Sequence, residues 1–193
     1  MNNYIAEYFD NLADGWDNCP AEFDMREKIM NLINVPIDAV IADIGCGKGV
    51  MIPHYLAKNP YAVFAVDVSS QMLFNAKKLF NDPRITYINA DIIEADLSPV
   101  DVAVAFNSYP HLTDKETLCA SLAKMVKPGG VFVIAHSRSR FFINRKHETI
   151  TANAISVPLL SAEEETMRFA EMFDAEVSTD TDEFYFIRLR RKK

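Results

Sequence analysis

The sequence ADIGCGKG at residues 42–49 decides the fold of this chain, because it places three of the six glycines within five positions. The segment AVIADIG at 39–45 is mostly apolar and predicts a buried strand that runs into the glycines. The residues after the glycines, VMIPHYLAK at 50–58, predict a helix, and Pro53 is tolerated in a first turn that has spare backbone donors. Such a strand, glycine turn and helix direct backbone N–H groups and the positive helix end at a ligand.

Beyond this turn the chain alternates short β-rich runs with amphipathic segments. Further strands are predicted at 61–68, 84–91, 101–108 and 131–137, and helices at 69–80, behind a serine cap, and at 113–126. A capping box from Thr113 to Glu116 begins the second of these helices, and KPGG at 127–130 is expected to turn the chain into the following strand. Strands that alternate with helices indicate βαβ units, and therefore a parallel sheet with helices on both faces.

The two ends of the chain depart from this repeat. Two helical stretches, 3–12 and 21–33, precede the first strand, so residues 1–35 are expected to form a helical cap. Residues 136–160 are expected to be a non-repeating insertion, after which SAEE at 161–164 reads as a second capping box. Two adjacent β-rich runs, AEVSTD and EFYFIRLRR, then close the chain, and we expect one domain over all 193 residues.

Composition and cysteine usage favour a reducing, cytoplasmic location and argue against a membrane-spanning, secreted or nucleic-acid-binding protein. No apolar run approaches the roughly 20 residues of a membrane span, and the N-terminus has neither a basic segment nor an apolar one typical of a secretory signal. The three cysteines are scattered and form no C-x-x-C pair, which argues against a disulfide framework or a zinc site. A formal net charge of −7 disfavours nucleic acid as a partner.

Two nucleotide-binding motifs fit the glycine turn poorly. A Walker loop needs a hydroxyl residue after its Gly-Lys pair, whereas Gly49 follows Lys48, and Ala42 stands where the first glycine belongs. A dinucleotide fingerprint, G-x-G-x-x-G, has Val50 in place of its third glycine. The glycine spacing therefore fits an NAD-dependent oxidoreductase poorly, but this alternative stays open at this point.

The stretch ADIGCGKG resembles motif I of the class I S-adenosylmethionine-dependent methyltransferases, and the resemblance extends over nearly the whole chain. Four further features recur in that family in the same order: the aromatic segment EYFDNLADGWD, an acidic end to the second strand, NAD after the third strand and KPGG before the fifth. The resemblance implies a Rossmann-like, doubly wound, seven-stranded and mostly parallel sheet. Its last two strands would form an antiparallel hairpin, and its cofactor would be S-adenosyl-L-methionine.

Two carboxylates match family positions that contact the nucleoside. Asp67, at the end of the second strand, matches the residue that accepts both ribose hydroxyls, although it could instead cap the helix beyond Ser69. A carboxylate suits a vicinal diol because it offers two oxygens to charge-assisted hydrogen bonds. Asp91 matches the acceptor of the adenine amino group, with Ile92 against the ring, and the alternative for Asp91 is an exposed loop carboxylate.

The methionine end of the cofactor has its own matching positions. Asp43 and Gly45 match residues that contact the methionine portion, and Phe106 and Asn107 match the segment that lines its end. The predicted cofactor set is completed by Cys46, Gly47, Val68 and Tyr8.

Tyr8 is included because the first helix covers the cofactor in relatives. Tyr4 and Tyr8 are four residues apart and share a helix face, which could equally pack on the sheet. Trp16 is assigned to packing, and Cys46 is expected to be a small residue in a crowded loop.

Methyl transfer is an in-line displacement on an activated methyl group, so a general base is required only if the acceptor must lose a proton. His111, in FNSYPHL just beyond the fourth strand, is the candidate base, with a capping or supporting role as the alternative. The same stretch lacks the [DNS]-P-P-[YFW] motif of methyltransferases that act on nucleic-acid amino groups, because Ser108 and Tyr109 interrupt it.

The stretch HSRSRFFINRKH at 136–147 is basic within an acidic protein. If it is helical, Arg140, Asn144 and His147 share a face, and with His136 they are predicted to bind an anionic small acceptor. A solvated basic helix is the alternative. The spacing of the histidines resembles no metal-ligand set, so no metal is expected.

These features together predict a small-molecule methyltransferase. The alternative from another class is a cofactor-binding accessory or regulatory protein without transfer activity. The acceptor atom and the oligomeric state are not specified by the sequence.

Overall fold

A single seven-stranded sheet forms the centre of the molecule in the computed structural model, which describes residues 3–16, 23–97, 99–148 and 155–193. The strands are β1 (Val40–Ile44), β2 (Ala62–Asp67), β3 (Ile85–Asn89), β4 (Val100–Phe106), β5 (Val126–His136), β6 (Phe173–Asp180) and β7 (Tyr185–Arg191). The α-helices are α1 (Asn3–Leu12), α2 (Phe23–Ile33), α3 (Ile52–Leu56), α4 (Ser70–Leu79), α5 (Lys115–Met125), α6 (Arg140–Glu148) and α7 (Ala162–Met167). A short 3₁₀ helix, η2 (Tyr109–His111), follows β4.

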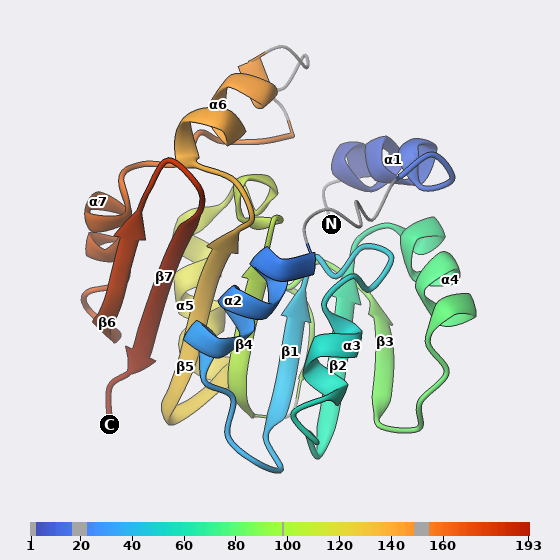
Figure 1. The fold of residues 1–193 in the computed structure, drawn as a ribbon, viewed down its shortest axis with the longest axis horizontal. Coiled ribbons are helices and arrows are strands. Elements are labelled where there is room, and N and C mark those ends of the chain that lie inside the picture. Colours follow the sequence, from blue (N-terminus) through green and yellow to red (C-terminus); the bar gives the residue numbers. More distant parts are fainter. Residues whose placement is uncertain (1–2, 17–22, 98, 149–154) are drawn as a thin grey trace.

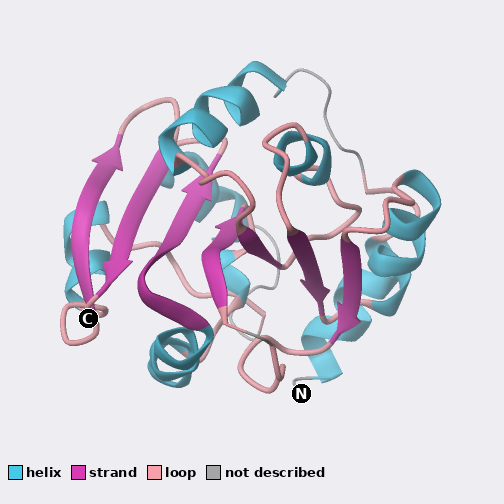
Figure 2. Cartoon of the chain, turned by 90° about the horizontal axis from the view of Figure 1, so that it is seen from below, coloured by secondary structure: helices cyan, strands magenta, loops and turns pink. Residues whose placement is uncertain are grey.

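The strand order is β3-β2-β1-β4-β5-β7-β6 (Figure 1). All pairs from β3 to β5 are parallel, whereas β7 is antiparallel to both β5 and β6. The order reverses between β1 and β4, and ligands of open α/β sheets bind beyond the carboxyl ends of the strands at such a switch point. This arrangement confirms the predicted doubly wound sheet with its antiparallel C-terminal hairpin, and the view along the sheet in Figure 2 shows helices on both sides of it.

Alternating side chains of the strands build one core on each face of the sheet. In β1, Ile41 packs into the core beneath α2 and α3, whereas Ala42 and Ile44 pack into the core beneath α5 and α7. Asp43 therefore points to the same face as Ile41, beneath α3. Its placement follows from strand periodicity and is decisive for the site described below.

The predicted N-terminal caps of two helices are confirmed. Ser69 caps α4 by accepting a hydrogen bond from the Met72 amide, and Ser161 and Glu164 form the complete capping box of α7. The α3 helix is shorter than predicted, but its proline does lie in its first turn.

Two sequence predictions of local structure are wrong. The N-cap of α5 is Asp114, whose side chain accepts from the Thr117 amide, so the capping box from Thr113 to Glu116 does not form. Thr113 and Asp114 are both good caps, and the cap lies one residue later than predicted. The KPGG segment lies inside β5, where the pairing with β4 shifts register, and Gly129 has a φ of +80° there.

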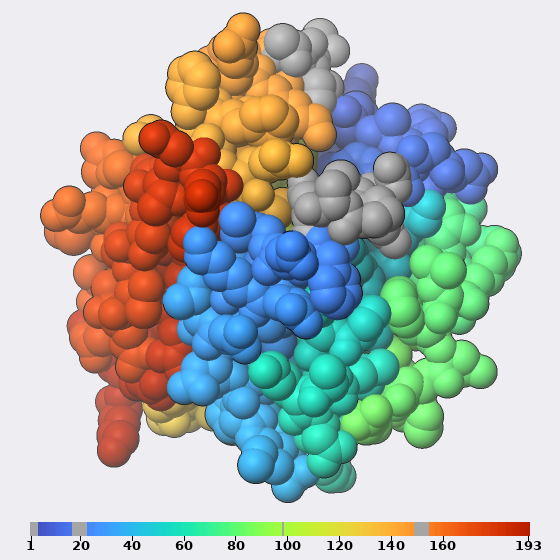
Figure 3. Space-filling view, viewed as in Figure 1, coloured from blue at the N-terminus to red at the C-terminus, as the bar shows by residue number. Residues whose placement is uncertain are grey.

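Two helices lie above the carboxyl edge of the sheet. In Figure 1, α1 lies above the ends of β1–β3 beside α4, and α6 rises beyond β5 and the β6–β7 hairpin. The space-filling view shows the same two segments, blue and orange, at the upper rim of the molecule (Figure 3). The second predicted cap helix, α2, instead packs on the sheet face through Ile29, Met30 and Ile33. None of the helices in the described ranges is long and apolar enough to cross a membrane.

Candidate functional site

A cavity of about 630 Å³ lies at the carboxyl edge of the sheet, between α1 and α6. The loops after β1, β2 and β3 line one half of it, which we call the cofactor half. The residues that follow β4 and β5, together with α6, line the other half, which we call the acceptor half. Most predicted site residues line this cavity: Asp43, Gly45, Cys46, Gly47, Asp67, Val68, Asp91, Ile92, Phe106, Asn107, His111 and His147.

The glycine turn is required by backbone conformation and by close packing. Gly45 has a φ of +68°, and a Cβ at this position would lie 2.5 Å from Ser108 Cβ. Ser108 cannot easily yield, because its Oγ donates a 2.6 Å hydrogen bond to the Ile44 carbonyl. Gly47 also has a positive φ of +55°, but no atom lies within 4 Å of the place where its Cβ would be. The first glycine therefore serves packing between the two halves, whereas the second leaves space at the cavity wall.

The backbone N–H groups of this turn are used differently from what the sequence predicted. The amides of Gly45 and Cys46 both donate to the Val66 carbonyl, at 2.8 and 3.0 Å. The Gly47 amide donates to Asp67 Oδ2 at 2.7 Å. These three donors therefore attach the turn to β2, and side chains rather than these amides present polar atoms to a ligand.

Asp67 is a buried carboxylate at the end of β2. Its Oδ1 accepts from the Ser69 amide at 2.9 Å and its Oδ2 accepts from the Gly47 amide. Ser69 itself is the N-cap of α4, so the alternative role of Asp67 as the helix cap is wrong. Burial raises its pKa to about 6, and the two backbone donors counteract that increase. Each carboxylate oxygen can accept further hydrogen bonds, so both remain able to bind a diol from the cavity.

Asp43 places a buried carboxyl group, one oxygen of which has no partner among the described residues, at the cavity wall. Its Oδ1 accepts a 3.2 Å hydrogen bond from the Tyr55 hydroxyl, but its buried Oδ2 has no hydrogen-bond partner among the described residues. Burial is the main reason that its pKa is raised to about 7, and the charge of Asp67 adds to it. An orphaned buried carboxylate oxygen is costly, and a cationic donor in the cavity would relieve that cost.

The other predicted cofactor residues surround these two carboxylates. Asp91 is half-buried and accepts from the Ile93 amide, and the buried Ile92 side chain lies beside it. Val68 is half-buried, and its carbonyl accepts from the Asn89 side chain. Cys46 is buried in the turn, where burial raises the pKa of its thiol well above the ordinary value. It is therefore a protonated thiol.

His111 lies at the centre of the acceptor half. Its Nδ1 is 2.9 Å from the Ile155 carbonyl, which can only accept, so Nδ1 carries the hydrogen and Nε2 keeps a lone pair. The ring is 4.9 Å from that of Phe9 and 5.0 Å from that of His147, centroid to centroid. Burial lowers the pKa of His111 to about 4, so the imidazole is neutral at physiological pH.

The ends of β4 and β5 are tied together beside this histidine. Asn107 adopts a φ of +54°, and its side chain both donates to Ser137 Oγ and accepts from the Ser137 amide. The side-chain amide of Asn107 therefore forms its hydrogen bonds with Ser137. Phe106 is buried and also lines the cavity.

Four predicted site residues do not line the cavity. Tyr8 packs edge-on against Phe9, on a helix whose cavity-facing residues are Ile5 and Phe9. Arg140 pairs with Asp180 at 2.6 Å, and Asn144 forms two hydrogen bonds with the backbone of Leu159. Both therefore attach α6 to other parts of the chain.

The fourth of these residues, His136, is buried beneath the acceptor half. Its ring lies 6.0 Å from that of Tyr185, and neither its nitrogens nor the Tyr185 hydroxyl has a hydrogen-bond partner among the described residues. Burial lowers the pKa of His136 to about 3. Within the described ranges, no three histidine, cysteine or acidic side chains are placed to hold a metal ion.

Several cavity residues were not predicted from the sequence. Phe9 and Trp16 line the cavity. From the sequence, Trp16 is expected to serve packing, and Tyr8 rather than the adjacent Phe9 is expected to contact the cofactor. Arg138 and Lys146 line the acceptor half in place of Arg140. The spacing of Ile5 and Phe9, four residues apart, was visible in the sequence, but the aromatic pair Tyr4 and Tyr8 has the same spacing.

Comparison with known proteins gives a consistent result. A family model described as a methyltransferase domain matches residues 41–130. An uncharacterized methyltransferase of Mycobacterium tuberculosis is 31% identical over 96 residues, which cover 49% of this chain and 48% of that protein. The trans-aconitate 2-methyltransferase of Azoarcus sp. is 34% identical over 112 residues, which cover 56% of this chain and 44% of that protein. The matched region thus spans about half the length of these relatives.

Solved structures share the fold over the full chain. The N-methyltransferase NodS of Bradyrhizobium japonicum, in complex with S-adenosyl-L-homocysteine, superposes with a TM-score of 0.74. The match covers 100% of both chains at 18% sequence identity, so it shows a common fold.

Proposed function

We propose that this chain is a class I S-adenosylmethionine-dependent methyltransferase, which transfers the methyl group of this cofactor to a small anionic molecule bound in the acceptor half. The observation that carries the proposal is that one cavity has a cofactor half and an acceptor half lined by different charged groups. The buried carboxylates of Asp43 and Asp67 line its cofactor half, where the Lys48 ammonium donates to the Trp16 carbonyl. His111, Arg138 and Lys146 line its acceptor half. A cationic sulfonium and an anionic acceptor would thus each meet charges of opposite sign.

The residues of the cofactor half fit S-adenosyl-L-methionine. The orphaned Oδ2 of Asp43 suits the ammonium group of the methionine portion, and Asp67 suits the ribose diol. Asp91 and Ile92 suit the adenine amino group and ring. When bound, the cofactor supplies an activated methyl group, so the chain has to align the acceptor and exclude water.

Charge in the acceptor half supports an anionic acceptor. Arg138 and Lys146 line this wall, and the Arg138 guanidinium lies 5.5 Å from the Phe142 ring centroid. The carboxylate on this side, Asp114, is used to cap α5. Guanidinium and ammonium groups bind carboxylate and phosphate through charge-assisted hydrogen bonds. The Azoarcus relative is named for trans-aconitate, a carboxylate, and this supports the same class of acceptor.

His111 is the group that we propose to orient the acceptor and receive its proton. Its Nδ1–H is fixed by the Ile155 carbonyl, so Nε2 is the atom that can accept a proton. The low pKa makes the free imidazole a weak base. An anionic acceptor beside it would favour the imidazolium and raise this pKa, so base strength increases when the acceptor binds.

The test is turnover on a panel of small carboxylates and phosphates, measured as formation of S-adenosyl-L-homocysteine. Arg138→Ala and Lys146→Ala should each raise the KM for the accepted substrate about tenfold, in line with loss of one charge-assisted hydrogen bond. Arg140→Ala is the matched control, because Arg140 pairs with Asp180 outside the cavity. Equal KM changes in all three variants would contradict an anion site at Arg138 and Lys146.

A cofactor-binding accessory protein without transfer activity is the alternative function. Nothing in the cavity favours it over the enzyme. It predicts tight binding of S-adenosyl-L-homocysteine together with no turnover of any acceptor in the panel.

A further inference from the structure

Two neighbouring residues of α1 contact opposite halves of the cavity. Asp10 Oδ1 accepts hydrogen bonds from Ser69 Oγ at 2.6 Å and from the Gln71 amide at 3.0 Å, at the start of α4. Phe9, one residue earlier, packs its ring edge-to-face against His111. The helix therefore spans the cavity from the cofactor half to the acceptor half.

Asp10 is linked through Ser69 to Asp67, the carboxylate proposed for the ribose. Ser69 donates its amide to Asp67 Oδ1 at 2.9 Å, while its Oγ donates to Asp10 and accepts from the Met72 amide. A single residue thus holds both carboxylates. The negative charge of Asp10 also adds to the burial that raises the pKa of Asp67, so the two groups interact electrostatically as well.

The contact at Phe9 continues into the segment that follows α1. The Phe9 ring is 5.8 Å from the ring of Trp16, centroid to centroid, and both side chains line the cavity. The Trp16 carbonyl accepts from Lys48 Nζ at 2.8 Å, so this segment is also attached to the glycine turn. Any movement of α1 would change the surroundings of His111, Trp16 and Ser69 together.

We propose that Asp10 and Phe9 are positioning residues that couple the two halves: Asp10 fixes α1 to Ser69 beside the ribose carboxylate, and Phe9 thereby fixes the ring of His111. Binding of the cofactor at Asp67 stabilises Ser69, Ser69 stabilises α1, and α1 orders the acceptor side. The proposal rests on the proposed roles of Asp67 and His111. It does not depend on which acceptor the enzyme uses.

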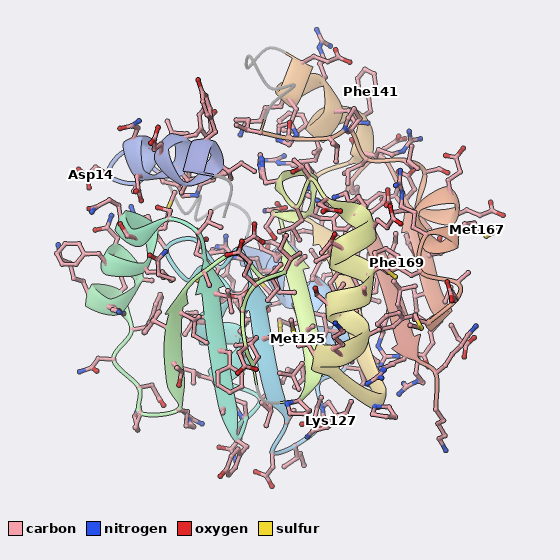
Figure 4. All side chains as sticks on the ribbon, turned by 180° about the vertical axis from the view of Figure 1, so that it is seen from behind. Asp14, Met125, Lys127, Phe141, Met167 and Phe169 are labelled. Carbon is pink, nitrogen blue, oxygen red and sulfur yellow. The ribbon has the colours of Figure 1, made fainter. Side chains whose placement is uncertain are left out.

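The first experiment measures binding of S-adenosyl-L-homocysteine by calorimetry at pH 8, where Asp67 is ionised. Asp10→Ala should weaken binding about tenfold, because α1 loses both hydrogen bonds to α4. Asp10→Asn should restore most of the affinity, because both donors bind the same oxygen, Oδ1, which asparagine retains. Asp14→Ala is the matched control of equal charge, since Asp14 is exposed at the outer end of the α1 segment (Figure 4).

The second experiment follows the ring signals of His111 by NMR as S-adenosyl-L-homocysteine is added. The chain has four histidines and one tryptophan, so single substitutions assign the ring signals and Trp16 fluorescence reports the same step. In the unmodified protein, saturation should shift the His111 signals. At saturating ligand, Phe9→Leu should abolish that shift and Asp10→Ala should reduce it.

Three results would overturn the proposal. One is an affinity for Asp10→Ala equal to that of Asp14→Ala, with circular dichroism showing both folded. Another is equal weakening in Asp10→Asn and Asp10→Ala, which would indicate a purely electrostatic effect on Asp67. The third is a His111 response that persists in Phe9→Leu, which would indicate direct contact with the ligand. Absence of turnover on every acceptor would contradict the proposed function alone and leave these binding results intact.

Discussion

The two halves of the cavity are built in different ways. In the cofactor half, Asp43 and Asp67 lie in β1 and β2, and the glycine turn follows β1 directly. In the acceptor half, His111 is held by Ile155, 44 residues away, and Asn107 is held by Ser137, 30 residues away. One half is thus specified by short local segments, and the other by contacts between distant ones.

This difference also appears in the electrostatics. Burial raises the pKa of the carboxylates in the cofactor half and lowers the pKa of the histidines in the acceptor half. In both halves burial favours the neutral form of these side chains in the ligand-free protein. A cationic ligand in the first half and an anionic ligand in the second would favour the charged forms, in line with the proposed cofactor and acceptor.

The contact between the halves at Gly45 gives the largest predicted effect. Gly45→Ala combines a positive φ with a Cβ 2.5 Å from Ser108 Cβ, so we expect a loss of about 3 kcal/mol in the free energy of unfolding. Gly47→Ala has the same backbone strain without the overlap, and should cost about 1 kcal/mol. Urea unfolding of both variants compares them, and equal losses would show that Ser108 yields.

Asp67→Ala removes the carboxylate proposed for the ribose and should weaken binding of S-adenosyl-L-homocysteine about 100-fold, or about 2.7 kcal/mol. The loss includes the contacts to Gly47 and Ser69, which shape the pocket. Calorimetry measures the affinity, with the exposed Asp96→Ala as a control of equal charge. An affinity within threefold of the unmodified protein would remove Asp67 from the cofactor site.

Asp43→Asn separates stability from cofactor binding. The folded pKa of Asp43, about 7, lies above its unfolded value, so its contribution to stability is complete below pH 4 and is lost as pH rises through 7. The asparagine variant stays neutral, so its Tm without ligand should exceed that of the unmodified protein at pH 8 but not at pH 4.

The same substitution should weaken cofactor binding. Loss of the negative charge is expected to lower the affinity for S-adenosyl-L-homocysteine about tenfold at pH 8. In the unmodified protein the affinity should fall as pH decreases from 8 to 5.5, because a cation binds the ionised carboxylate. Calorimetry across this range tests the idea, and a pH-independent affinity would contradict it.

His136→Phe should give the smallest effect, on the acceptor side. A buried ring without hydrogen-bond partners is replaced by an apolar ring, so we expect a gain of about 1 kcal/mol in the free energy of unfolding at pH 7. The folded pKa of His136, about 3, lies below its unfolded value, so its contribution to stability is lost as pH falls below 6.5. The variant should therefore lose less stability between pH 7 and 5, as thermal unfolding would show.

Much of the fold could be predicted from local signals. The predicted helix at 3–12 matches α1, and the serine cap of α4 and the capping box of α7 are both present. The C-terminal hairpin, which the family resemblance implied, also forms. The errors arose where two residue types favour the same local role. Thr113 and Asp114 both cap helices well, and a Gly-Gly pair suits either a turn or an irregularity within a strand.

The candidate site was predictable only in part, for a related reason. Residues at strand ends, such as Asp43 and Asp67, are placed by the period of the strand and line the cavity as expected. On a helix, the spacing of side chains is fixed but the face that turns inward is not. The sequence therefore could not distinguish Tyr8 from Phe9, or Arg140 from Lys146.

The sequence by itself determined the alternation of strands and helices, the glycine turn and the carboxylates at the ends of β1 and β2, because each depends on neighbours within a few residues. Only the tertiary structure decided the tautomer of His111, the use of Arg140 as a tie to Asp180 and the span of α1 across the cavity. Each of these depends on side chains from segments about 40 to 60 residues apart, whose meeting is set by packing of the whole chain.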